Sequence, residues 1–222
     1  MQRAERPGPP AVIWVLAIIF AAVEIAMVAA DALSGVGPGE ISELRYWMTV
    51  HFAFLDLLFE AVREGAAAPW FFWTSFVTYA FLHGGTLHLV MNGAIFLALG
   101  GAVANLIGTA RFLIFFVVTA IAGALTFALI TDVQGPMVGA SGVIFGLFGA
   151  LKRWEWRWIR ETGAPANRFW GTIIALTLMN VLLFFAFPGG GSIALEAHLG
   201  GFVAGWFIAP FLAPGRAGPS PI

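Results

Sequence analysis

Six apolar runs spread over the chain constrain its fold more than any other feature of the sequence. A helix needs about 20 mostly apolar residues to cross the hydrocarbon core of a bilayer. Of the 222 residues, 60% are hydrophobic and 10% are charged, whereas a soluble domain has about 25% charged residues. The sequence therefore predicts an all-α membrane protein with one domain over residues 1–222. The candidate spans are residues 11–30, 76–99, 112–130, 139–151, 169–187 and 194–212.

A long external loop, residues 31–73, is expected between the first two spans. Apolar side chains recur at three- and four-residue steps over residues 40–64, which predicts an amphipathic helical segment on the bilayer surface. A small helical cap without membrane contact is the alternative interpretation. The four aromatic residues at 70–73 are typical of an interfacial belt.

The basic residues predict the orientation of the spans. Nine of the 11 lie at the amino terminus, after the second span, after the fourth span and in the tail. Cytoplasmic connections are enriched in Lys and Arg, so both termini are expected in the cytoplasm. We expect a multi-pass protein of a bacterial inner membrane, and the near-neutral net charge of −1 gives no indication of a nucleic-acid partner.

Five polar side chains are expected at one depth of the membrane. With this topology the second, fourth and sixth spans all run from outside to inside. His83, His88 and Asn92 then lie in the outer half of the second span, Ser141 opens the fourth, and His198 is early in the sixth. Polar groups are costly inside a membrane and usually face the bundle interior or a water-filled cavity. We therefore expect one shared site beneath the outer surface.

The fourth span is predicted to be short. Thirteen apolar residues make roughly 20 Å of helix, against a hydrocarbon core of about 30 Å. Lys152 and Arg153 are expected to mark its cytoplasmic end. Ser141 would then lie below the outer surface, after a non-helical stretch over 131–138. Such backbone is tolerated only within protein or beside water.

Glycines predict which spans pack together. Close helix approach in membranes uses small residues at four-residue steps. The fourth and sixth spans both have such a seam, which would bring Ser141 towards His198. Its glycines are Gly142, Gly146 and Gly149 on one span and Gly201 and Gly205 on the other.

A serine beside a histidine suggests nucleophilic catalysis. A serine hydroxyl needs an adjacent base, and histidine suits that role near neutral pH. We expect a dyad of Ser141 and His198, because Glu196 points to another side of the helix. The amides of Ser141 and Gly142 stand at a helix start, where N–H groups lack partners.

Asn92 and His88 share one face of the second span, because they are four residues apart on a helix. Their side chains can add hydrogen-bond donors for the oxyanion that forms when an amide is attacked.

Three motifs together resemble the rhomboid family of intramembrane serine proteases. They are His-Gly-Gly-Thr-Leu-His-Leu-Val-Met-Asn over 83–92, Gly-Ala-Ser-Gly over 139–142 and Ala-His-Leu-Gly-Gly over 197–201. The resemblance covers all six spans and the long first loop. It implies a six-helix rhomboid-like bundle that hydrolyses peptide bonds in or near transmembrane segments of membrane proteins. Substrates would enter sideways from the lipid, past the fifth span, and no metal or cofactor would be used.

The resemblance also assigns roles to single residues. It makes Ser141 the nucleophile and His198 its base, with His88 and Asn92 at the oxyanion site. It makes His83 chiefly structural, tying the second span to the first loop. Near the site, Gly201 belongs to the third motif. Phe145 matches a family tyrosine that stacks on the base and keeps that stacking face.

Two further positions depart from the family pattern. Thr74-Ser75 replaces a Trp-Arg pair of the first loop, which puts a loop-anchoring contact in doubt. Ala104 replaces an acidic residue near the end of the second span, and neither departure removes a catalytic group.

Three other functions fit the sequence less well than proteolysis. A silent relative that escorts membrane clients would usually lack the serine or the histidine, and both are present. A transporter would need polar groups continuing to the inner side, where these spans are apolar. A metal site of His83, His88 and His198 would lack the carboxylates that usually orient such ligands. The sequence assigns no role to Glu24 in the first span.

Overall fold

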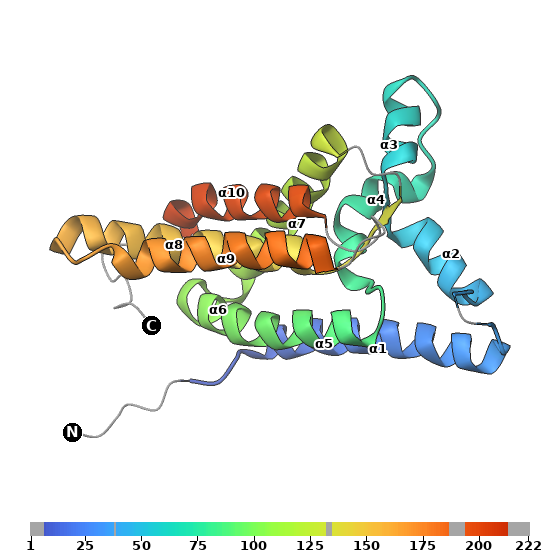
Figure 1. Cartoon of the computed structure of the whole chain (residues 1–222), viewed down its shortest axis with the longest axis horizontal. Coiled ribbons are helices and arrows are strands. Elements are labelled where there is room, and N and C mark those ends of the chain that lie inside the picture. The colour runs from blue at the N-terminus through green and yellow to red at the C-terminus, as the bar shows by residue number, and fades with distance from the viewer. Residues whose placement is uncertain (1–6, 38, 132–134, 187–193, 213–222) are drawn as a thin grey trace.

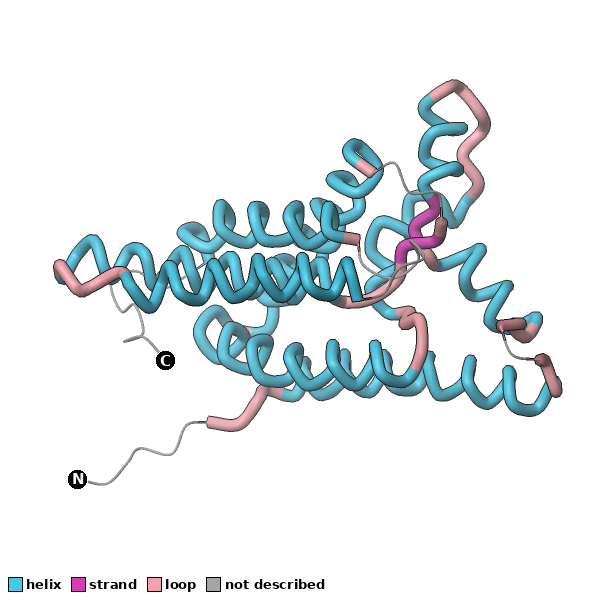
Figure 2. The backbone as a smooth tube through the Cα atoms, viewed as in Figure 1, coloured by secondary structure: helices cyan, strands magenta, loops and turns pink. Residues whose placement is uncertain are grey.

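A computed structural model describes residues 7–37, 39–131, 135–186 and 194–212, with the backbone alone for 179–186. The described chain is mainly helical, with one two-stranded antiparallel sheet (Figure 2). Within it, four helical stretches are long and apolar enough to cross a membrane, which confirms the all-α membrane class. They are Ala11–Ser34, Thr86–Ile107, Thr109–Ile130 and Leu195–Leu212. The count of six spans stays a prediction.

The long helices form a bundle (Figure 1). At one end lies the segment between the first two of them, which we call the external segment after its predicted location. Helix α1 (Ala11–Ser34) packs beside α5 (Thr86–Ile95), and α10 (Leu195–Leu212) packs mainly on α8 (Ser141–Thr162) and α7 (Thr109–Ile130). Helices α5, α8 and α10 all begin at the end where α2, α3 and α4 gather. This arrangement brings the three motif-bearing segments to the same end of the bundle.

The external segment contains three helices, not one. They are α2 (Glu43–Phe52), α3 (Asp56–Arg63) and α4 (Trp70–Thr78). Most of residues 40–64 are helical, in α2 and α3, and the two helices are separated by strand β1 (Phe54–Leu55), which pairs with β2 (Pro136–Met137). Contact of this segment with the bilayer stays a prediction. Phe54 is buried, and its ring packs against those of Phe59, Phe76 and Phe127. The strand pairing joins the external segment to the chain that precedes Ser141.

The second span lies further along the chain than predicted. The range 76–99 is wrong, because residues 76–85 belong to the end of α4, a 3₁₀ turn η1 (Tyr79–Phe81) and a loop. Gly85 ends this loop with a φ of +133°, which side-chain-bearing residues rarely adopt. The helix starts at Thr86 and continues through a π turn η2 (Phe96–Gly100) into α6 (Gly101–Ile107). His83 therefore precedes the span.

Helix α8 runs well beyond the predicted end at residue 151. Lys152 lies inside this helix, where its ammonium pairs with Glu155 and lies over the ring of Phe169. The Trp154 Nε1–H donates to the carbonyl of Ala209 at 3.1 Å, which joins this part of α8 to α10. The helix is thus longer than the predicted segment, while the length of its membrane-crossing part stays a prediction. The non-helical stretch before Ser141 is present over 135–140, while 132–134 lie outside the described residues.

The other span boundaries shift little. Helix α1 extends four residues beyond the predicted end, α7 starts three residues before the predicted residue 112, and α10 starts one residue later than predicted. Helix α9 (Asn167–Ala186) starts two residues before the predicted residue 169. The predicted end of that span, residue 187, lies outside the described residues.

A glycine seam joins α8 to α10, as the spacing of the glycines predicts. A Cβ added to Gly201 would lie 1.9 Å from the Gly142 carbonyl oxygen, and one added to Gly205 would lie 2.0 Å from the Gly146 oxygen. On the opposite helix, a Cβ on Gly149 would lie 2.1 Å from the Phe202 oxygen. The two backbones are in direct contact, so only glycine fits at these positions.

Candidate active site

Ser141 is the first residue of α8 and follows a loop with constrained backbone. Gly139 has a φ of +116°, and its N–H donates to the carbonyl of Tyr79 at 3.0 Å. The first N–H groups of a helix have no intrahelical acceptor, and the helix dipole gives this end a partial positive charge. The hydroxyl of Ser141 thus stands beside its own amide and that of Gly142, at a place suited to a developing negative charge.

The side chains of His88 and Asn92 face the loop that precedes Ser141. A Cβ placed on Gly139 would lie 2.8 Å from His88 Nε2 and 3.3 Å from Asn92 Nδ2. The sequence prediction that both residues share one face of the span is confirmed by this common contact. Both groups therefore lie against the backbone two residues before the serine.

The orientation of the His88 ring is held by a backbone N–H of the turn that precedes α5. The Gly84 N–H donates to His88 Nδ1 at 3.3 Å. A neutral imidazole that accepts at Nδ1 has its proton on Nε2. The Nε2–H, which lies on the Gly139 side, is then available as a donor.

The amide of Asn92 is buried and has a donor to spare. The residue is 7% exposed, and its Nδ2 has no hydrogen-bond partner among the described residues. Buried donors are nearly always paired with protein or water. An unpaired Nδ2 beside the Gly139 loop is a free donor directed at the same region as His88 Nε2.

His198 lies across the glycine seam from the serine. Gly142 follows Ser141, and Ala197 precedes His198. A Cβ on Gly142 would lie 3.5 Å from the Ala197 carbonyl oxygen and 4.0 Å from its Cβ. The ring of His198 stacks on Phe145, with centroids 4.2 Å apart. Since Phe145 is one turn after Ser141 on the same face of α8, the structure brings α8 and α10 together at the level of both residues.

Tyr79 supports this loop and was not singled out by the sequence analysis. It is 1% exposed, and its hydroxyl donates to the Ala120 carbonyl at 3.0 Å. The same hydroxyl would be 2.9 Å from a Cβ on Gly142, while the Tyr79 carbonyl accepts from Gly139. The chain has only two tyrosines. The position of Tyr79 at the edge of an apolar run is the feature of the sequence that could have identified it.

His83 lies deep in the turn before α5, away from the glycine seam. Its ring is 5.2 Å from that of His88 and 5.6 Å from that of Phe20 on α1. Its carbonyl oxygen accepts a hydrogen bond from Arg45 of the external segment. Among the described residues, no three acidic or histidine side chains come together as a metal site would require.

The structure shows the surroundings of the two positions that depart from the family pattern, Ala104 and Thr74-Ser75. Ala104 is 2% exposed and packs in the apolar core, so this position holds no charge. The hydroxyls of Thr74 and Ser75 bond to the carbonyls of Phe71 and Phe72, within their own helix. Neither side chain anchors the loop to the rest of the bundle.

Comparison with known proteins agrees with this geometry. The family model described as the rhomboid domain matches residues 70–215, which include α4 to α10. RHOMBOID-like protein 5 of Arabidopsis thaliana is 34% identical over 136 residues, 60% of this chain and 41% of the relative. Rhomboid protease GluP of Bacillus subtilis (strain 168) is 30% identical over 150 residues, 66% and 27% respectively.

Rhomboid protease GlpG of Yersinia enterocolitica is 27% identical over 168 residues, 69% of this chain and 56% of the relative. The chain thus spans between about a quarter and just over half of these relatives' own lengths. Since the matched domain covers most of the chain and contains all three motifs, this protein belongs to the rhomboid family.

Proposed function

We propose that this protein is an intramembrane serine endopeptidase that uses a dyad of Ser141 and His198. The observation that supports it best is the contact of Gly142 with Ala197 across the seam, because these residues adjoin the serine and the histidine. The matched family and the relatives named as rhomboid proteases support the same class of reaction.

In this mechanism His198 accepts the hydroxyl proton of Ser141 as the serine oxygen attacks the substrate carbonyl carbon. The carbonyl oxygen becomes an oxyanion, and the C–N bond then breaks as His198 gives the proton to the leaving amine. Water, activated by His198, hydrolyses the acyl-enzyme and regenerates the serine. Phe145 keeps the imidazole plane fixed through both steps.

The oxyanion is stabilised by donors from two elements. The amides of Ser141 and Gly142 come from the start of α8, and the Nε2–H of His88 and the Nδ2–H of Asn92 come from α5. Donors fixed before the reaction stabilise charge without reorganisation, and each is worth about a hundredfold or more in rate. The Gly139 loop lies between these two sources.

The proposed substrates are transmembrane segments that enter sideways from the lipid. The charge distribution supports an orientation with both termini in the cytoplasm. In the inner membrane of a bacterium, the membrane that we propose, this orientation places the active site near the outer face. A reporter fused after residue 222 tests this orientation, and an external location would refute it.

A fluorophosphonate probe tests the activity itself, because it labels only an activated serine. We expect labelling of the detergent-solubilised wild-type protein, and no labelling of Ser141→Ala with the same melting temperature. Absence of labelling in the folded wild-type protein, with no cleavage of a single-span substrate in vesicles, would favour a silent relative that binds membrane clients.

A further inference from the structure

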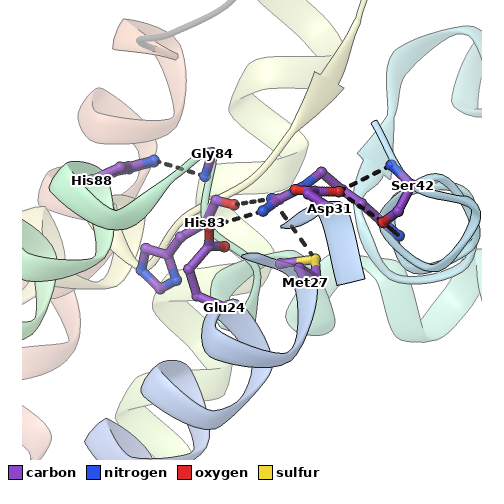
Figure 3. Close-up of polar contacts among 8 residues, drawn as sticks. Glu24, Met27, Asp31, Ser42, His83, Gly84 and His88 are labelled. Carbon is purple, nitrogen blue, oxygen red and sulfur yellow. Dashed lines mark hydrogen bonds and ion pairs between the residues drawn. The ribbon is translucent and has the colours of Figure 1, made fainter. Parts of the chain in front are cut away.

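Three charged residues form a network between α1 and the external segment (Figure 3). The Arg45 Nε donates to Asp31 Oδ2 at 2.6 Å, and its Nη2 donates to Glu24 Oε1 at 3.2 Å. Ser42 caps α2 and donates both its hydroxyl and its N–H to Asp31 Oδ1, at 2.7 and 2.9 Å. The network thus joins α1 to the start of α2 through the guanidinium of Arg45 and through Ser42.

The network is costly to place where it is. Glu24 is 1% exposed in the middle of a mainly apolar helix, and the Arg45 side chain is 14% exposed. Burial alone would lower the pKa of Arg45, but hydrogen bonds to Asp31 and Glu24 raise it above its ordinary value, so the guanidinium stays charged. Charges at such sites usually have a function that a hydrophobic pair would not perform.

One peptide group connects this network to the active site. The Arg45 Nη1 donates to the carbonyl oxygen of His83 at 3.5 Å, the long end of the hydrogen-bond range. The N–H of the same peptide group, that of Gly84, donates to His88 Nδ1 at 3.3 Å. A cation at the oxygen polarises the peptide, which strengthens its N–H as a donor. The two contacts therefore act in series, from Arg45 to the imidazole of His88.

We propose that Arg45 is a positioning residue for the active site, which fixes the orientation and tautomer of His88 through the His83–Gly84 peptide. The two carboxylates of α1 hold the guanidinium, and the guanidinium holds the peptide. The peptide N–H occupies Nδ1 of His88, so the proton stays on Nε2, towards Gly139. The effect of Arg45 on His88 does not require catalysis. Its consequence for an oxyanion rests on the proposed function.

Two further observations agree with this role. Within the described part of the chain, the hydroxyls of Thr74 and Ser75 bond to carbonyls of α4 itself and not to the turn before α5. Glu24, Asp31 and Arg45 also lie outside the matched family domain, which begins at residue 70. The anchor of the His83–Gly84 turn is thus supplied by the part of the chain that precedes the domain.

Nitrogen NMR of the imidazoles tests the positioning without any substrate. The chain has four histidines, so protein labelled with ¹⁵N only in histidine gives few signals, which single His→Gln variants assign. We expect His88 of the folded wild-type protein to be the neutral Nε2–H tautomer. In Arg45→Gln we expect a mixture of both tautomers, whereas Arg63→Gln, whose side chain pairs with Glu60 on the exposed face of α3, should match the wild type.

Arg45→Gln leaves the buried carboxylate of Glu24 without its partner. The double variant Glu24→Gln/Arg45→Gln removes that charge as well, and it should show the same mixture of tautomers. An unchanged Nε2–H tautomer in both folded variants would overturn the proposal. If the wild-type protein cleaves no substrate but the tautomer still depends on Arg45, the proposed function fails and the positioning role stands.

Kinetics separate a positioning role from a merely structural one. Misplacing a catalytic group by about 1 Å can cost a hundredfold in rate, so we expect Arg45→Gln to lower kcat by about ten- to a hundredfold with KM unchanged. In a His88→Ala background the same change should have no further effect, while in Asn92→Ala it should retain its full effect. Equal losses in both backgrounds would overturn the proposal.

Discussion

The imidazole of His198 and the ring of Phe145 lie face to face, with centroids 4.2 Å apart and planes inclined by 7°. One residue belongs to α10 and the other to α8, so the stack crosses the same pair of helices that the glycine seam joins. Aromatic stacking is worth about 0.5–1.5 kcal/mol beyond the area it buries. This contact fixes the plane in which the proposed base can accept and return a proton.

Replacing the stacking face should slow proteolysis without abolishing it. We expect Phe145→Leu to lower kcat by roughly two- to tenfold, the rate equivalent of that stacking energy. Phe145→Tyr keeps the ring and should cleave a model substrate at about the wild-type rate. A fully active Phe145→Leu would show that the stack has no part in holding the base.

Removing either side-chain donor of the oxyanion site should impair chemistry rather than folding. We expect Asn92→Ala and His88→Ala each to lower kcat by about a hundredfold or more. Since Asn92 Nδ2 bonds to none of the described residues, its loss should leave the melting temperature unchanged. Met91→Ala, at an exposed neighbouring position, is the control. Wild-type cleavage by both folded variants would remove these residues from the site.

The proposed dyad should behave as one unit in a mutant cycle. We expect Ser141→Ala and His198→Ala each to abolish proteolysis, and the double variant to be no worse than either single variant. Effects within a nucleophile–base pair are strongly non-additive, because each residue is useless without the other. Separate, multiplying losses measured in vesicles would instead indicate that the two residues have unrelated roles.

The glycine seam should tolerate no added methyl group. A Cβ at position 201 would overlap the Gly142 carbonyl, so we expect Gly201→Ala to lower the free energy of unfolding by roughly 3 kcal/mol. Gly171 on α9 has nothing within 4 Å of its Cβ position, and Gly171→Ala should leave stability unchanged or raise it by up to about 1 kcal/mol. Reversible unfolding in mixed detergent measures both, and equal stability of the two variants would contradict the seam.

Some of this structure is predictable from the sequence because its signals are local. The glycines of α8 and α10 repeat at steps that only helix packing requires, and they correctly pair the two helices. His88 and Asn92 share a face because they are four residues apart. The apolar runs give the membrane class, since a bilayer demands length and composition alone.

Other features depend on contacts that no local pattern records. The apolar run through residues 76–99 hides a break at Gly85, whose φ is a tertiary property. The ammonium of Lys152 lies over the ring of Phe169 on α9, a contact between two helices that the local sequence does not show. Arg45 joins Glu24 and His83, 21 and 38 residues away. Such pairs become visible only in three dimensions.

The seam between α8 and α10 is made by backbone atoms, so it does not depend on the side chains at positions 141 and 198. A descendant of this chain can therefore lose its nucleophile or its base and inherit the helix pair intact. Selection on shape and selection on chemistry act on different residues here. Sorting active from inactive descendants requires the identities of two side chains, because the architecture is the same in both.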